Sequence, residues 1–215
     1  MSLEENILDN NTKATEAIKD YAYPLNFQFK VTSLANDFNV KDANGKSLAY
    51  VRQKMFKLKE AISVFSNENK TELLYKINAD RIIDFNASYS FTNADEEVIG
   101  RIGRKGAKSI LKANYEIFNK DNKQEFVINE ENPWAKVGDA VLGEIPIVGI
   151  FTGYFCNPRY AIKRADGTIV ARLSKEASFM GRKFKLEKLS ELNEGEGERM
   201  VLAIMMMSLL ERRRG

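Results

Sequence analysis

The sequence contains no histidine and a single cysteine, Cys156. Without histidine, the chain cannot build a Ser-His-Asp or Cys-His catalytic centre, nor a zinc site of the usual His/Cys kind. One cysteine excludes an internal disulfide and is typical of a reducing compartment. Because Cys156 lies in the apolar run YFCNP, we expect it to be a buried, inert thiol rather than a nucleophile.

The sequence also lacks a long apolar run and a recognisable targeting segment. The run IPIVGIFTGYF has 11 residues, whereas a membrane-spanning helix needs about 20. The opening residues MSLEENILDN carry acids instead of a basic region followed by an apolar one, so we expect no secretory signal. They also lack the Met-Gly start that N-myristoylation requires. We therefore expect a cytoplasmic protein, with a peripheral membrane location as the alternative.

The composition indicates a soluble globular protein with a real core. Of the 215 residues, 44% are apolar and 29% are charged, as is usual for such proteins. The net charge of +3 is mild and does not predict nucleic-acid binding, which needs a concentrated basic face.

One pattern recurs five times along the chain. Each copy opens with alternating aromatic or β-branched residues, passes through a turn rich in Asn, Asp or Gly, and continues as a second apolar strand. Such turns tolerate left-handed backbone angles, so each copy predicts a β-hairpin. The copies are FNVKDANGKSLAYVR (38–52), ISVFSNENKTELLYK (62–76), YSFTNADEEVIGR (89–101), YEIFNKDNKQEFVIN (115–129) and YAIKRADGTIVAR (160–172).

Two further strands, at about 25–33 and 183–192, bring the predicted total to about twelve, all antiparallel neighbours. In the last strand we expect Phe184, Leu186 and Leu189 to face inward. Residues 1–22 predict an N-terminal helical extension, and residues 23–215 one domain with a short inserted helix near 133–142.

The C-terminal segment RMVLAIMMMSLLERRR predicts a helix near 198–213 that is apolar on every side, since only Ser208 is polar from Met200 to Leu210. A helix of this kind must be enclosed by protein, and a closed sheet of about twelve strands is wide enough to hold it. The predicted fold class is therefore mostly β: a closed antiparallel barrel of about 12 strands enclosing a C-terminal hydrophobic helix. The alternative is a surface helix in a dimer interface.

This arrangement resembles the tubby C-terminal-like superfamily, in particular its LURP-one-related and phospholipid scramblase-like branch. The resemblance is carried by YFCNPRYAIKRADGTIVARLSKEASFMGRKFKLEKL followed by MVLAIMMMSLLERRR. It implies a barrel threaded by its own C-terminus and, as in tubby proteins, phosphoinositide binding through basic residues on the barrel wall. Scramblase-type members also have a final spanning helix, acylated cysteines and calcium. The cysteine cluster is missing here, so scrambling activity is not implied.

The stretch GRIGRKGAKS (100–109) is the densest basic segment. It contains Arg101, Arg104, Lys105 and Lys108 and no acid. It is not a phosphate-binding P-loop, because Ala107 separates the glycine from the Lys-Ser pair. We favour an ordinary solvated connection, with a loop that binds phosphoinositide or another anionic lipid as the alternative.

A second basic set follows from the hairpin repeat. Arg52, Lys76, Arg101 and Arg172 occupy matching places on the outgoing strands, so alternation predicts that they share the outer face of the barrel. We favour pairing with neighbouring acids, with a basic stripe for phosphate head groups as the alternative. Arg52 also begins a basic run with Lys54, Lys57 and Lys59.

No catalytic, metal-binding or cofactor-binding residues are indicated. Adjacent acids such as Glu96 and Glu97 point to opposite faces of an extended strand and cannot share a site. The sequence therefore predicts a non-enzymatic module without a cofactor, which binds anionic phospholipid head groups through Arg52, Lys54, Arg101, Arg104, Lys105 and Lys108. The alternative is a structural or protein–protein interaction protein without lipid affinity.

Overall fold

The computed structural model describes residues 21–30, 37–53, 62–80, 88–104, 114–131, 158–176 and 183–212. The helix expected within residues 1–22, the inserted helix near 133–142 and Cys156 lie wholly or almost wholly outside these ranges. The strands are β1 Leu25–Phe29, β2 Phe38–Lys41, β3 Ser47–Arg52, β4 Ile62–Phe65, β5 Leu73–Ala79, β6 Ser88–Asn93, β7 Val98–Arg104, β8 Asn114–Asn119, β9 Gln124–Glu130, β10 Arg159–Lys163, β11 Ile169–Glu176 and β12 Lys183–Lys188, and the helix is α4 Glu196–Arg212.

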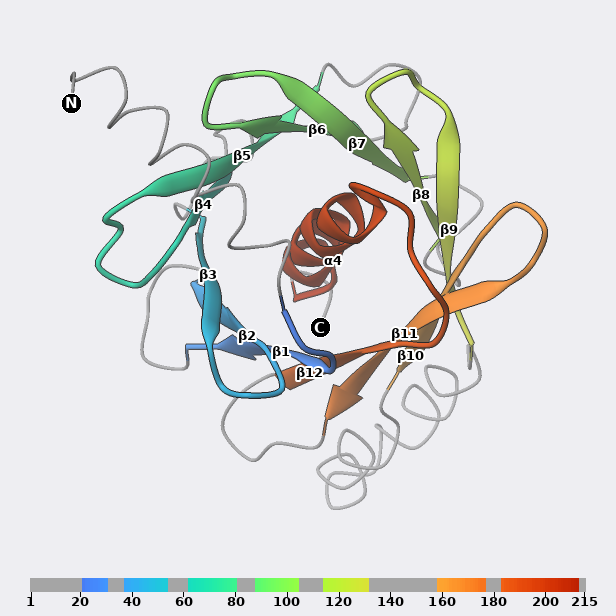
Figure 1. Ribbon diagram of the computed structural model, residues 1–215, viewed down its shortest axis with the longest axis horizontal. Helices are drawn as coiled ribbons and strands as arrows, with labels where there is room; N and C mark the ends of the chain where they lie inside the picture. The colour runs from blue at the N-terminus through green and yellow to red at the C-terminus, as the bar shows by residue number, and fades with distance from the viewer. Residues whose placement is uncertain are drawn as a thin grey trace, which may run out of the picture.

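The twelve strands form a closed antiparallel barrel in chain order (Figure 1). Closure comes from β1 and β12, where Leu25 lies opposite Leu186 and Phe27 opposite Phe184. Among the twelve described strands, this contact leaves no edge for pairing with another chain. The predicted fold class is confirmed.

The five predicted hairpins are all present and share one turn geometry. Each turn has one residue with a positive φ, and its N–H donates to the carbonyl three residues earlier at 3.0–3.1 Å. Next to each turn the strand register shifts by one residue, as expected for a type I turn followed by a left-handed residue and a bulge. The left-handed residues are Gly45, Lys70, Glu96, Asn122 and Gly167.

Inward-facing apolar side chains alternate along the strands and pack around α4, which runs through the middle of the barrel (Figure 1). Every side chain from Met200 to Leu209 is buried. Each large apolar side chain among them contributes about 1.5–3 kcal/mol. The interpretation of this segment as a surface helix in a dimer interface is wrong.

The last strand is shorter than predicted. It ends at Lys188, and the N–H groups of Leu189 and Ser190 both donate to the carbonyl of Val170. This turns the chain away from the wall. Leu189 is therefore 48% exposed, and the expectation that it faces inward is wrong. Phe184 and Leu186 are buried as predicted.

The barrel has two different ends because consecutive strands alternate in direction. All five hairpin turns lie at one end, which we call the hairpin end. The connections from β1 to β2, β3 to β4, β5 to β6, β7 to β8, β9 to β10 and β11 to β12 leave from the other end, which we call the crossover end. The chain enters the lumen at the hairpin end, since β12 finishes there and residues 189–195 lead into α4.

Candidate functional site

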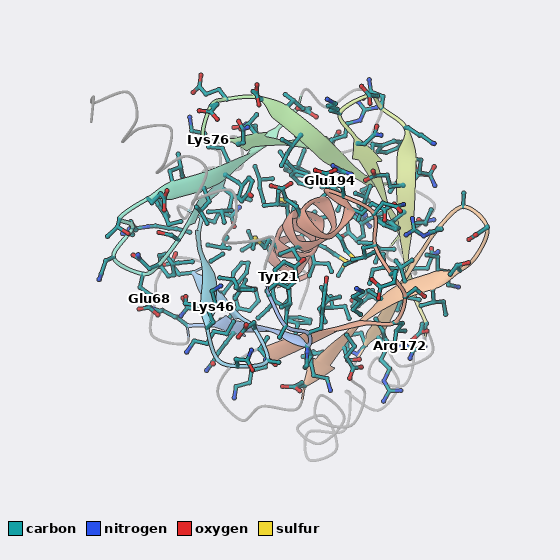
Figure 2. All side chains as sticks on the ribbon, viewed as in Figure 1. Tyr21, Lys46, Glu68, Lys76, Arg172 and Glu194 are labelled. Carbon is teal, nitrogen blue, oxygen red and sulfur yellow. The ribbon has the colours of Figure 1, made fainter. Side chains whose placement is uncertain are left out.

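The cations at matching places in the hairpin repeat lie on the outer wall, as their alternation predicts. The residues before and after Lys76, Tyr75 and Ile77, are buried inside the barrel. The same holds for Arg101, between Gly100 and Ile102. Figure 2 shows Lys76 and Arg172 outside the ring of strands.

Two of these cations are neutralised by acids, which confirms the favoured interpretation for them. Lys76 lies 3.0 Å from Glu96, and the ammonium group holds the pKa of this carboxyl below its usual range. Arg172 donates through Nε and Nη2 to Glu131 at 2.9 and 3.1 Å. Such half-exposed pairs contribute little to stability, and they leave little net charge for a ligand.

The other two cations, Arg52 and Arg101, are not paired with an acid of the described residues. Among the described residues, no carboxylate lies within 4.0 Å of Arg52 or Arg101. The guanidinium of Arg101 lies over the ring of Phe118, 5.0 Å from its centroid, on the neighbouring strand. Stacking of this kind holds the guanidinium in place while its N–H donors remain at the ring's periphery.

Arg104 differs from Arg101 because it lies on the other face of the wall. β7 continues to Arg104, so the first part of GRIGRKGAKS is strand and not a loop. Arg104 is two residues beyond the inward-facing Ile102 and pairs in register with Tyr115, which is 1% exposed. Alternation therefore places Arg104 on the inner face, at the crossover end. Lys54, Lys105 and Lys108 lie outside the described residues.

The two predicted basic clusters do not share one side of the wall. Twelve strands around a closed barrel are about 30° apart. Arg52 on β3 and Arg101 on β7 are four strands apart, so their side chains point in directions that differ by about 120°. They do share an end, because Arg52 is the last residue of β3 and Arg104 the last of β7, and both strands run toward the crossover end.

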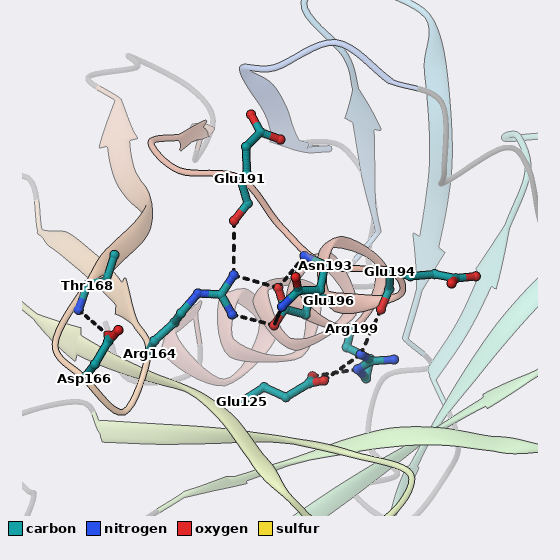
Figure 3. A network of polar contacts seen from close by, with 9 residues as sticks. All are labelled: Glu125, Arg164, Asp166, Thr168, Glu191, Asn193, Glu194, Glu196 and Arg199. Atoms are coloured by element: carbon teal, nitrogen blue, oxygen red, sulfur yellow. Dashed lines mark hydrogen bonds and ion pairs between the residues drawn. The ribbon is translucent and has the colours of Figure 1, made fainter.

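The hairpin end holds a polar network that sequence reasoning missed (Figure 3). Arg199 of α4 donates through Nε and Nη2 to Glu125 of β9 at 2.7 and 2.6 Å. Arg164, in the turn between β10 and β11, donates to both carboxylate oxygens of Glu196 at 2.5 and 2.8 Å. In the sequence, the feature that could have predicted this network is the group of charged residues, Glu196, Glu198 and Arg199, at the start of an otherwise apolar helix.

A third polar contact completes the network. The hydroxyl of Tyr75 on β5 donates to Glu198 at 2.5 Å, and burial together with the charge of Glu198 raises the pKa of Tyr75. Burial alone would raise the pKa of Glu196, but hydrogen bonds from Arg164 and Asn193 outweigh it and lower that pKa. Glu196 and Glu198 therefore act as structural carboxylates in the first turn of α4.

The described residues hold no group of three or more acids or cysteines arranged to bind a metal ion. Within the same part of the chain, no helix is both long and apolar enough to span a bilayer.

Comparison with known protein families gives a match. The model of the family described as LURP-one-related matches residues 48–207, which is more than half of the chain. No curated protein and no solved structure matches.

Proposed function

The chain belongs to the LURP-one-related family, within the tubby-like superfamily, and on that premise we propose a non-enzymatic module that binds anionic phospholipid head groups with the crossover end of the barrel. The observation that carries this proposal is the shared position of the two basic clusters. Arg52 and Arg104 end their strands at the same end of the barrel. In sequence, Lys54 follows the first of them and Lys105 and Lys108 follow the second.

The distribution of charge along the barrel axis supports the same face. Residues 94–97, in the turn between β6 and β7, carry three acids and no cation, and residues 189–198 carry four glutamates and no cation. Residues 105–113, which join β7 to β8, carry three lysines and no acid. An anionic surface therefore attracts the crossover end and repels the hairpin end.

The geometry of the wall favours contact through an end over contact through a side. A flat membrane meets only one side of a cylinder, and Arg52 and Arg101 point about 120° apart around it. An end-on approach brings the clusters after β3 and β7 to the bilayer together. Each basic residue near an anionic surface contributes about 1 kcal/mol. Arg101, farther from the end, then binds head groups beside the barrel. This contact places the protein at the cytoplasmic face of a membrane.

The test is sedimentation with phosphatidylcholine vesicles, with and without a phosphoinositide, at low and high salt. We expect binding that requires the phosphoinositide and weakens with salt. The double variant Arg52→Gln/Lys105→Gln should bind at least tenfold more weakly, since two contacts of about 1 kcal/mol are lost.

A matched control removes two exposed cations from the opposite end, with Lys120→Gln/Lys123→Gln in the β8–β9 hairpin. This variant should bind like the unmodified chain. Vesicles of equal charge made with phosphatidylserine separate head-group recognition from general attraction. Absence of binding to any anionic vesicle at low salt would reject the proposal and favour a structural or protein–protein interaction role.

A further inference from the structure

The apolar surface of α4 does not define the rotation of the helix about its axis or its depth in the barrel. Every side chain from Met200 to Leu209 is buried, so no polar face distinguishes one orientation from another. A shift by one residue rotates the helix by about 100° and moves it about 1.5 Å. Apart from Ser208, such a shift replaces apolar side chains by other apolar side chains, and flexible methionines adapt to the change.

Polar contacts at the start of α4 do distinguish orientations. Glu196, Glu198 and Arg199 lie within four consecutive residues. Their partners are Arg164 beside β10, Tyr75 on β5 and Glu125 on β9. β5 and β9 are four strands apart, about 120° around the wall. A rotation or a slide of α4 therefore breaks contacts on both sides of the barrel.

Two glycines leave the space that the side chain of Arg199 occupies. A Cβ at Gly100 of β7 would lie 2.7 Å from Cδ of Arg199, and one at Gly195 would lie 2.6 Å from its Nη1. The side chains of Arg199 and Glu125 are only 14% and 11% exposed. Any other helix register would leave these two charges largely buried and apart, which proteins tolerate poorly.

We propose that three contacts, Arg199–Glu125, Arg164–Glu196 and Tyr75–Glu198, fix one rotation and one depth of α4 in the barrel. Other registers of the helix bury nearly the same apolar surface, so these contacts decide which register has the lowest free energy. We call the three contacts the pin. A buried polar pair that specifies register in this way is known from coiled coils. The pin acts at the hairpin end and is independent of lipid binding at the crossover end.

The test uses methyl NMR of the full chain with ¹³C-labelled methionine. Met200, Met205, Met206 and Met207 lie in α4 and report its position. In the unmodified chain each should give one methyl signal. In the variant Arg199→Leu/Glu125→Gln, we expect the signals of these residues to split or broaden while circular dichroism still shows a folded barrel.

The matched control is Arg172→Leu/Glu131→Gln, which removes an Arg–Glu pair of the same type on the outer wall. Its methionine signals should stay single. The charge-reversed chain Arg199→Glu/Glu125→Arg should regain one set of signals, a recovery that loss of general stability does not explain.

The milder variant Arg199→Lys covers the case in which Arg199→Leu/Glu125→Gln does not fold. It keeps the charge beside Glu125 but loses the two-bond contact, so partial broadening is expected. The proposal is overturned if the folded Arg199→Leu/Glu125→Gln chain gives single, unshifted methionine signals. If that chain does not fold, the same result in the Arg199→Lys chain overturns it.

Discussion

At the scale of single residues, the hairpin turns show how local backbone demands act on sequence. The same left-handed position is filled by glycine in two turns and by Lys70, Glu96 and Asn122 in the other three. A residue with a Cβ pays about 1–2 kcal/mol for this conformation, whereas glycine does not. Asparagine is the best tolerated of the three because of its short polar side chain.

Replacement of Lys70 by glycine should stabilise the protein. Lys70 has φ of 58° and an exposed side chain, so the gain in backbone conformation outweighs the added freedom of the unfolded chain. We expect the free energy of unfolding in urea to rise by about 0.5–1 kcal/mol.

The reciprocal change, Gly45→Ala, serves as the comparison. A Cβ there meets nothing within 4 Å, and φ is 80°, so only the backbone conformation is tested. This variant should lose about 1 kcal/mol. If both substitutions change stability in the same direction, the shared turn geometry does not determine the preference.

At the scale of elements, the contact between β7 and α4 depends on Gly100, which has no side chain to occupy the space between them. A Cβ at Gly100 would lie 2.6 Å from the carbonyl oxygen of Phe118 and 2.7 Å from Cδ of Arg199. Backbone of the neighbouring strand and the first turn of the helix therefore both occupy the space that any other residue would fill. By contrast, a Cβ at Gly103 of the same strand has only an ordinary contact at 3.9 Å.

We expect Gly100→Ala to lower the free energy of unfolding by about 1–3 kcal/mol, the usual effect of overpacking. Gly103→Ala should change it by less than about 0.5 kcal/mol. Thermal and urea unfolding of the two variants measure the difference. Equal stabilities would mean that β7 and α4 do not approach as closely as the structure shows.

At the scale of the whole molecule, wall and helix depend on each other. The inward-facing side chains of the strands and those of α4 form one core, and the helix also occupies the space in which a barrel of this size could carry a ligand. Binding through the outside of an end is therefore compatible with this core, whereas binding in the lumen would compete with α4.

A chain that stops before Glu196 should not form the barrel. The lost helix contributes about 1.5–3 kcal/mol for each large buried apolar side chain. Together these contributions are at least as large as most of the total stability of about 5–15 kcal/mol that is usual for a domain. Near-ultraviolet circular dichroism should show loss of fixed tertiary packing. A chain shortened only by residues 213–215 is the control, and a truncated chain that keeps native spectra would contradict this view of the core.

The sequence by itself determined the local features of this protein. Turn residues and alternating apolar positions specify each hairpin within about 15 residues, and the uniformly apolar helix requires an enclosing wall. Alternation also placed Lys76, Arg101 and Arg172 on the outer face, because the period of a strand is a property of the backbone. The predictions that rested on such local rules were confirmed for the five hairpins, for the enclosed helix and for these three cations. The same alternation was wrong for Leu189, because the last strand ends at Lys188.

Only the tertiary structure decided which distant residues meet. Arg199 and Glu125 are 74 positions apart, and no local rule pairs them, since their contact depends on how the barrel closes and how deep the helix lies. Closure also separated Arg52 from Arg101 around the wall. Direction around a cylinder is a property of the closed sheet, so it cannot be read from any single strand.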